Sequence, residues 1–121
     1  MTGAAAIAKT DALRPNAIGF DQKLSWLADL DELIYREIVM THEHEEGTTF
    51  KRYETGEEEL IAPSPYDEVY HHFLAMQISL AGREIAMYNN DKTLYNNAYL
   101  TFQDYYNREH MPIARVMRWN I

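Results

Sequence analysis

The clearest regularity in the chain is a helical spacing of apolar residues between residues 20 and 41. These residues recur at steps of three and four, which places them on one face of a helix: Phe20, Leu24, Leu27, Leu30, Ile34 and Ile38. Asp31 falls on the apolar side and interrupts the pattern. The spacing therefore predicts either one helix over 20–41 or two shorter helices, with Asp31 as the N-cap of the second.

Before this helix, residues 3–13 form an alanine-rich stretch. A helix of about 11 residues is marginal unless it packs on a partner. Pro15 follows directly, in the motif Arg14-Pro15-Asn16, and a helix rarely continues through proline. We expect a short N-terminal helix that ends at this motif.

The strongest local start signal is Ser64-Pro65-Tyr66-Asp67, with serine as N-cap and proline at the first helical position. Two adjoining apolar stripes follow, so we predict a central helix over 66–88 with Phe73 in the core. Asn89-Asn90 can close this helix, and Asp91 can open a last one over 91–106. The residues expected to face inward in the last helix are Leu94, Ala98, Phe102 and Tyr105.

Between these helices, residues 42–63 show no period and carry seven acidic residues and two glycines. We expect a long acidic loop. A minor β-hairpin is compatible with the pattern, with residues 48–53 and 59–62 as its strands, although one such pair is marginal alone. The fold class predicted is mainly α: a small helical bundle of three main helices plus a short N-terminal helix, in a single domain over 1–121.

Composition narrows the function classes. Apolar residues make up 46% of the chain and charged residues 25%, as in a globular protein. The absence of cysteine gives no support for secretion. We therefore expect an intracellular, soluble protein. The formal net charge is −8, which disfavours tight binding to nucleic-acid phosphates. No apolar run has the length of a membrane span.

Candidate chemistry is sparse. His42, His44 and the neighbouring glutamates, and the pair His71-His72, invite a metal interpretation, but adjacent histidines on a helix diverge by about 100° and the first group lies in a predicted loop. The three serines are Ser25, Ser64 and Ser79, and all are explained as helix surface or cap. No phosphate-binding glycine loop is present. We predict no catalytic residue, no cofactor and no metal, and hence a protein that is not an enzyme.

The C-terminal tail, residues 111–121, differs from the acidic body because it is apolar and basic and follows Pro112. Its candidate interface residues are Arg115, Arg118, Trp119 and Ile121, since Trp and Arg are enriched at binding hot spots. We expect the tail to be mobile in the free protein and to become ordered on a neighbouring subunit. The alternative is that its apolar residues fold back onto the helices as core.

Several segments in this order resemble the small head–tail connector (adaptor) proteins of tailed bacteriophages and prophages. The resemblance covers about residues 10–112 and is carried by packing and capping motifs: Asp11-Ala12-Leu13-Arg14-Pro15-Asn16, Lys23-Leu24-Ser25-Trp26-Leu27 with Leu30-Asp31, Leu60-Ile61-Ala62-Pro63-Ser64-Pro65-Tyr66-Asp67, Tyr88-Asn89-Asn90 and Tyr105-Tyr106-Asn107.

This resemblance implies a virion structural protein that is assembled in the host cytoplasm. It would form a homo-oligomeric ring beneath the portal, contact portal and tail-side proteins, and let DNA pass without specific binding. The alternative from a different class is a small regulatory or inhibitory protein whose acidic loop binds a basic partner surface.

Overall fold

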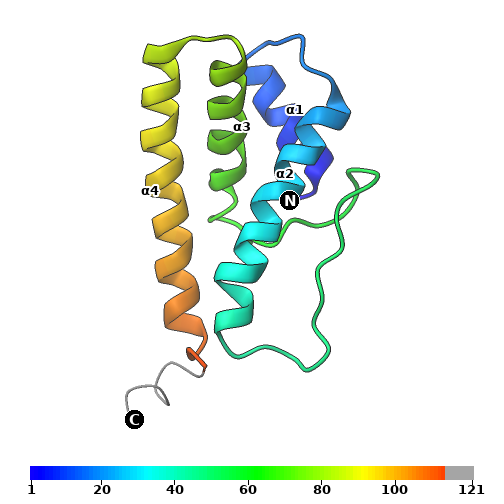
Figure 1. The fold of residues 1–121 in the computed structure, drawn as a ribbon, viewed down its shortest axis with the longest axis vertical. Helices are drawn as coiled ribbons and strands as arrows, with labels where there is room; N and C mark the ends of the chain where they lie inside the picture. The colour runs from blue at the N-terminus through cyan, green and yellow to red at the C-terminus, as the bar shows by residue number, and fades with distance from the viewer. Residues whose placement is uncertain (114–121) are drawn as a thin grey trace.

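The computed structural model describes residues 1–113, and the chain over these residues is mainly helical, as predicted. Its four helices are α1 (Gly3–Leu13), α2 (Phe20–Glu37), α3 (Glu68–Ala81) and α4 (Ile85–Glu109), and a short 3-10 helix, η1 (Val39–Thr41), follows α2. Residues 1–113 contain no β-strand, so the predicted hairpin is not confirmed. Figure 1 shows α3 and α4 side by side, with α1 and α2 on the other side of α3.

Helix α3 is central, as its wide apolar arc predicts, because it contacts each of the other three helices. The core consists of buried side chains from α1, α2, α3, α4 and the long loop: Ala6, Ile7, Leu24, Leu27, Leu30, Ile34, Ile38, Leu60, Ala62, Val69, Tyr70, Leu74 and Phe102. Phe73, expected in this core, is only partly buried and packs against its edge, where its ring lies 5.3 Å from that of Tyr95.

The first helix ends where the sequence predicts, with Arg14 as its C-cap. Helix α2 is a single helix, which excludes a second start at Asp31. Asp31 lies inside α2, is fully buried and accepts three hydrogen bonds. A polar residue on the apolar face therefore marks a buried hydrogen-bonding centre and not a helix boundary.

Two predicted boundaries around α3 are wrong. Helix α3 begins at Glu68 with Asp67 at its N-cap, because residues 64–67 form turns, within which the Ser64–Pro65 peptide bond is cis. It ends at Ala81, because Arg83 adopts a left-handed conformation (φ 58°) and the amide of Glu84 turns back to the carbonyl of Ser79.

As a result, α4 starts at Ile85, earlier than predicted, and runs through Asn89-Asn90 and Asp91 without a break. Asp91 is a buried residue of this helix, and Leu94, expected to face inward, is exposed.

The loop over 42–63 follows the outer side of α2 and returns to the start of α3 (Figure 1). Backbone hydrogen bonds join it to the N-terminus: the amide of Ala4 donates to Gly56 O at 2.7 Å, and the amide of Leu60 donates to Met1 O at 2.9 Å. These contacts bring the first residues of the chain against the loop.

Candidate protein-interaction surface

Helix α4 packs on α3 and on the turn before it through a row of aromatic rings. Tyr66, in that turn, stacks on Tyr105 with ring centroids 4.2 Å apart, and Phe102 is fully buried beside Tyr105. Large aromatic side chains bury much apolar area and pack in defined orientations. One face of α4 is therefore fixed against the body, and its other face is left toward solvent.

Beside this row lies an open groove, which we call the α2–α4 groove, with a volume of about 430 Å³. It is lined by Leu33 of α2 and by Tyr95, Asn96, Tyr99 and Leu100 of α4. Leu33 and Leu100 are 45% and 55% exposed, and burial raises the pKa of the Tyr95 phenol to about 12, so this side chain is neutral. Exposed apolar side chains beside neutral tyrosines are typical of a protein contact surface.

Charge is distributed unevenly between the groove and the rest of the molecule. Residues 20–63 hold twelve acidic residues against four basic ones, a net charge of −8. Helix α4 has five charged residues in 25, three acidic and two basic, and one of these, Asp91, is buried. The outer face of α4 is instead rich in asparagine, threonine and glutamine, so it can approach another protein with little electrostatic repulsion.

A buried hydrogen-bonding centre fixes the acidic loop to the body. The Asp31 carboxylate accepts hydrogen bonds from the hydroxyls of Tyr53 and Tyr70 and from the amide of Ile61, and Tyr70 also accepts from the amide of Ala62. Burial raises the pKa of Asp31 to about 6, although the hydrogen bonds oppose this rise. Every donor is matched, which indicates a structural role.

A second polar network joins α1 to the α3–α4 hairpin. The Arg14 guanidinium binds the Asp91 carboxylate with two nitrogens, at 2.6 and 3.1 Å, and Ser79 donates to the same carboxylate at 2.6 Å. Arg14 and Ser79 together hold the pKa of Asp91 below its usual value against the effect of burial. Ser79 is buried, so its assignment to a solvent-facing helix surface is wrong.

The end of α4 is tied to the end of α2 near the start of the tail. His42 is buried, and its Nε2 lies 2.6 Å from the side-chain oxygen of Asn107. Met111 and Ile113 pair with the backbone of residues 41–43. The first three residues of the predicted tail thus belong to the body.

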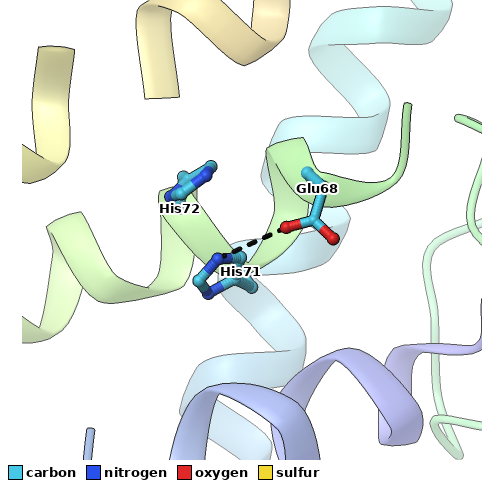
Figure 2. Close-up of side chains that lie close together, drawn as sticks. All are labelled: Glu68, His71 and His72. Atoms are coloured by element: carbon cyan, nitrogen blue, oxygen red, sulfur yellow. Dashed lines mark ion pairs between the residues drawn. The ribbon is translucent and has the colours of Figure 1, made fainter. Parts of the chain in front are cut away.

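The other histidine pair lies in a different environment. His71 and His72, on the first turns of α3, have ring centroids 4.2 Å apart, so their rings do not diverge as the sequence analysis assumed. Glu68 precedes them on the same helix, and its Oε2 lies 3.5 Å from His71 Nε2 (Figure 2). The spacing Glu-x-x-His-His makes Glu68 the i−3 neighbour of one histidine and the i−4 neighbour of the other. That signal was present in the sequence and was missed.

The candidate interface residues inferred from sequence, Arg115, Arg118, Trp119 and Ile121, lie outside the described residues. The groove residues Leu33 and Leu100 were not singled out, although both are leucines that fall off the apolar stripes of their helices. Apolar residues outside a stripe are the sequence signal that could have indicated this surface.

Comparison with known proteins identifies no relative of this chain. No family model matches the chain, and neither the curated proteins nor the solved structures contain a match. Across residues 1–113, none of the helices combines the length and apolar character needed to span a membrane.

Proposed function

We propose that this chain is a small helical-bundle adaptor that assembles with copies of itself into a ring and joins the head and tail of a bacteriophage-like particle. The resemblance of residues 10–112 to head–tail connector proteins suggests the class. Further support comes from the outer face of α4, whose exposed basic and acidic residues balance and which adjoins a groove with exposed leucines on an otherwise acidic molecule.

A closed ring requires two unlike surfaces on each subunit, because each copy meets its neighbours head to tail. The α2–α4 groove is one such surface. The apolar, basic tail that contains Arg115, Arg118, Trp119 and Ile121 is a suitable second surface, since its charge is opposite to that of the body. We propose that the tail of one subunit docks on its neighbour or on the portal.

The acidic surface of residues 20–63 suits a DNA passage. Carboxylates repel the phosphate backbone, so a channel lined or surrounded by them would let the duplex slide without being held. The alternative function, that of a regulatory or inhibitory protein that binds a basic partner, would use the same acidic surface. Self-assembly through the α2–α4 groove and the outer face of α4 is expected of a connector protein and not of an inhibitor, so it distinguishes the two functions.

The experiment is a measurement of molar mass in solution as a function of protein concentration, followed by electron microscopy of the assembled fraction. We expect concentration-dependent oligomers that include rings. Leu100→Glu should suppress them without lowering the melting temperature, because this leucine is 55% exposed. Gln22→Glu adds the same charge at an exposed position of α2 and should leave assembly intact.

Truncation tests the tail. The cut belongs after Ile113, because the amide of Ile113 donates to Thr41 O and a shorter chain would remove a contact of the body. The docking proposal expects a chain of residues 1–113 that melts as the full chain does and no longer assembles. A full-length protein that stays monomeric at every concentration and binds a basic protein would instead favour the inhibitor function.

A further inference from the structure

Three potential metal ligands lie together where α3 begins. Glu68, His71 and His72 occupy consecutive turns of one helix at spacings of three and four residues. A carboxylate and an imidazole spaced in this way on a helix form a common ligand pair in metal-binding helical bundles. Here one glutamate is spaced correctly for two histidines.

The distances suit a single ion. One ligand atom from each residue lies within 4.8 Å of the other two, and Glu68 Oε2 is 3.5 Å from His71 Nε2. Two ligands bound at about 2.0–2.1 Å to a tetrahedral ion are about 3.4 Å apart. The ligand atom of His72 must move closer to reach the same separation. Figure 2 shows the Glu68 carboxylate directed toward the His71 ring, with His72 adjacent on the helix.

Burial lowers the pKa of both His71 and His72, which favours the neutral imidazole, the form that binds metal ions. Lys9, whose Nζ lies 2.6 Å from Glu68 Oε1, lowers the pKa of Glu68, so this carboxylate is ionised. Lys9 occupies one oxygen of the carboxylate and leaves Oε2 toward the histidines.

We propose that Glu68, His71 and His72 bind one divalent late transition-metal ion, Zn²⁺ or Ni²⁺. Two imidazoles and a carboxylate suit these ions, whereas Mg²⁺ and Ca²⁺ prefer sites made of oxygen alone. Both histidines also line a hollow of about 130 Å³ between α1, α3 and α4, so an open coordination position can be filled from solvent. This binding goes beyond the proposed assembly function and does not depend on it.

The test uses Co²⁺ as a spectroscopic probe and Zn²⁺ in calorimetry, with the full-length chain. We expect one Co²⁺ per chain, with visible absorption bands of a low-coordinate site that Zn²⁺ abolishes. Glu68→Gln, His71→Gln and His72→Gln should each weaken binding by at least about tenfold, since even the loss of an outer partner of a ligand costs that much. Glu68 is exposed, so its variant will fold.

Two further variants make the test specific. His44→Gln removes a histidine of the loop, where its Nδ1 contacts His42 O, and should leave binding unchanged. Lys9→Gln removes the cation that competes for Glu68 and should tighten binding several-fold. The proposal is overturned if the wild-type chain binds no stoichiometric Co²⁺, if binding survives the three ligand variants, if His44→Gln abolishes it, or if Lys9→Gln weakens it.

Discussion

The acidic loop over residues 42–63 and the α3–α4 hairpin are held in place by different mixtures of contact. The loop has no regular backbone ladder and is fixed by single backbone hydrogen bonds to the first residues of the chain and by Asp31 with Tyr53 and Tyr70. The hairpin is fixed mainly by apolar and aromatic packing around Phe102, with the Arg14–Asp91–Ser79 network at its turn end. The acidic loop thus depends mainly on a few matched hydrogen bonds, whereas the hairpin depends mainly on buried area and keeps an outer face toward solvent.

The largest effect is expected from the hairpin. Phe102→Ala should lower the free energy of unfolding by about 3–5 kcal/mol, because this ring is fully buried and its removal leaves a cavity. Chemical denaturation measures the loss. Leu100→Ala, two residues away on the exposed side, is the matched control and should change stability by less than about 0.5 kcal/mol. Similar losses for both variants would show that the outer face of α4 is not free.

Phe102 also shows what the sequence could predict. Its inward position follows from helical spacing, as do the existence of all four helices and the central place of α3. The turn between α3 and α4 was predicted too late in the chain: Gly82, which caps α3, weakens the helix at this point, but the left-handed residue is Arg83 and not a glycine or asparagine. Asn89-Asn90 resembles a helix end but lies at exposed positions of α4, where tertiary packing allows the helix to continue.

The candidate sites were less predictable for a physical reason. A stripe of apolar residues shows which face of a helix is buried, but not which exposed residues of two helices lie beside each other. Leu33 and Leu100 are 67 positions apart and meet only in the folded chain. The Glu68–His71–His72 cluster is local, and its spacing was readable once the glutamate was counted with the histidines.

The next effect concerns the anchor of the acidic loop. Because the pKa of Asp31 is raised from 3.8 to about 6 on folding, the folded state holds its proton more tightly than the unfolded chain. The stability that this carboxyl group contributes is fully present below pH 3.8, and about 3 kcal/mol of it is lost as the pH rises through about 6. Asp31→Asn should remove this loss. The test is the free energy of unfolding, measured by chemical denaturation at several pH values, as the difference between the variant and wild type at each pH.

The control for Asp31 is Asp29→Asn, on the exposed side of the same helix, which should leave that pH-dependent loss in place. Other carboxylates, including Glu68 and Asp91, have lowered pKa values and contribute the opposite slope, so only the difference between variants is diagnostic. If wild type and Asp31→Asn show the same dependence between pH 4 and 6, the loop is not anchored through this carboxylate.

The smallest effect is expected from the charged contacts on the surface of the same region. Arg52 joins the loop to α2 by ion pairs with Asp29 at 2.9 Å and Glu32 at 3.1 Å; Arg52 and Asp29 are well exposed to water and Glu32 is 34% exposed. Such pairs contribute little, so Arg52→Ala should cost less than about 1 kcal/mol, and the cost should shrink further at about 1 M salt because the charges are screened. Denaturation at low and high salt measures both. A loss well above 1 kcal/mol that shrinks at high salt would mean that the acidic loop is held by its surface charges as much as by Asp31, and the contrast with the hairpin would then fail.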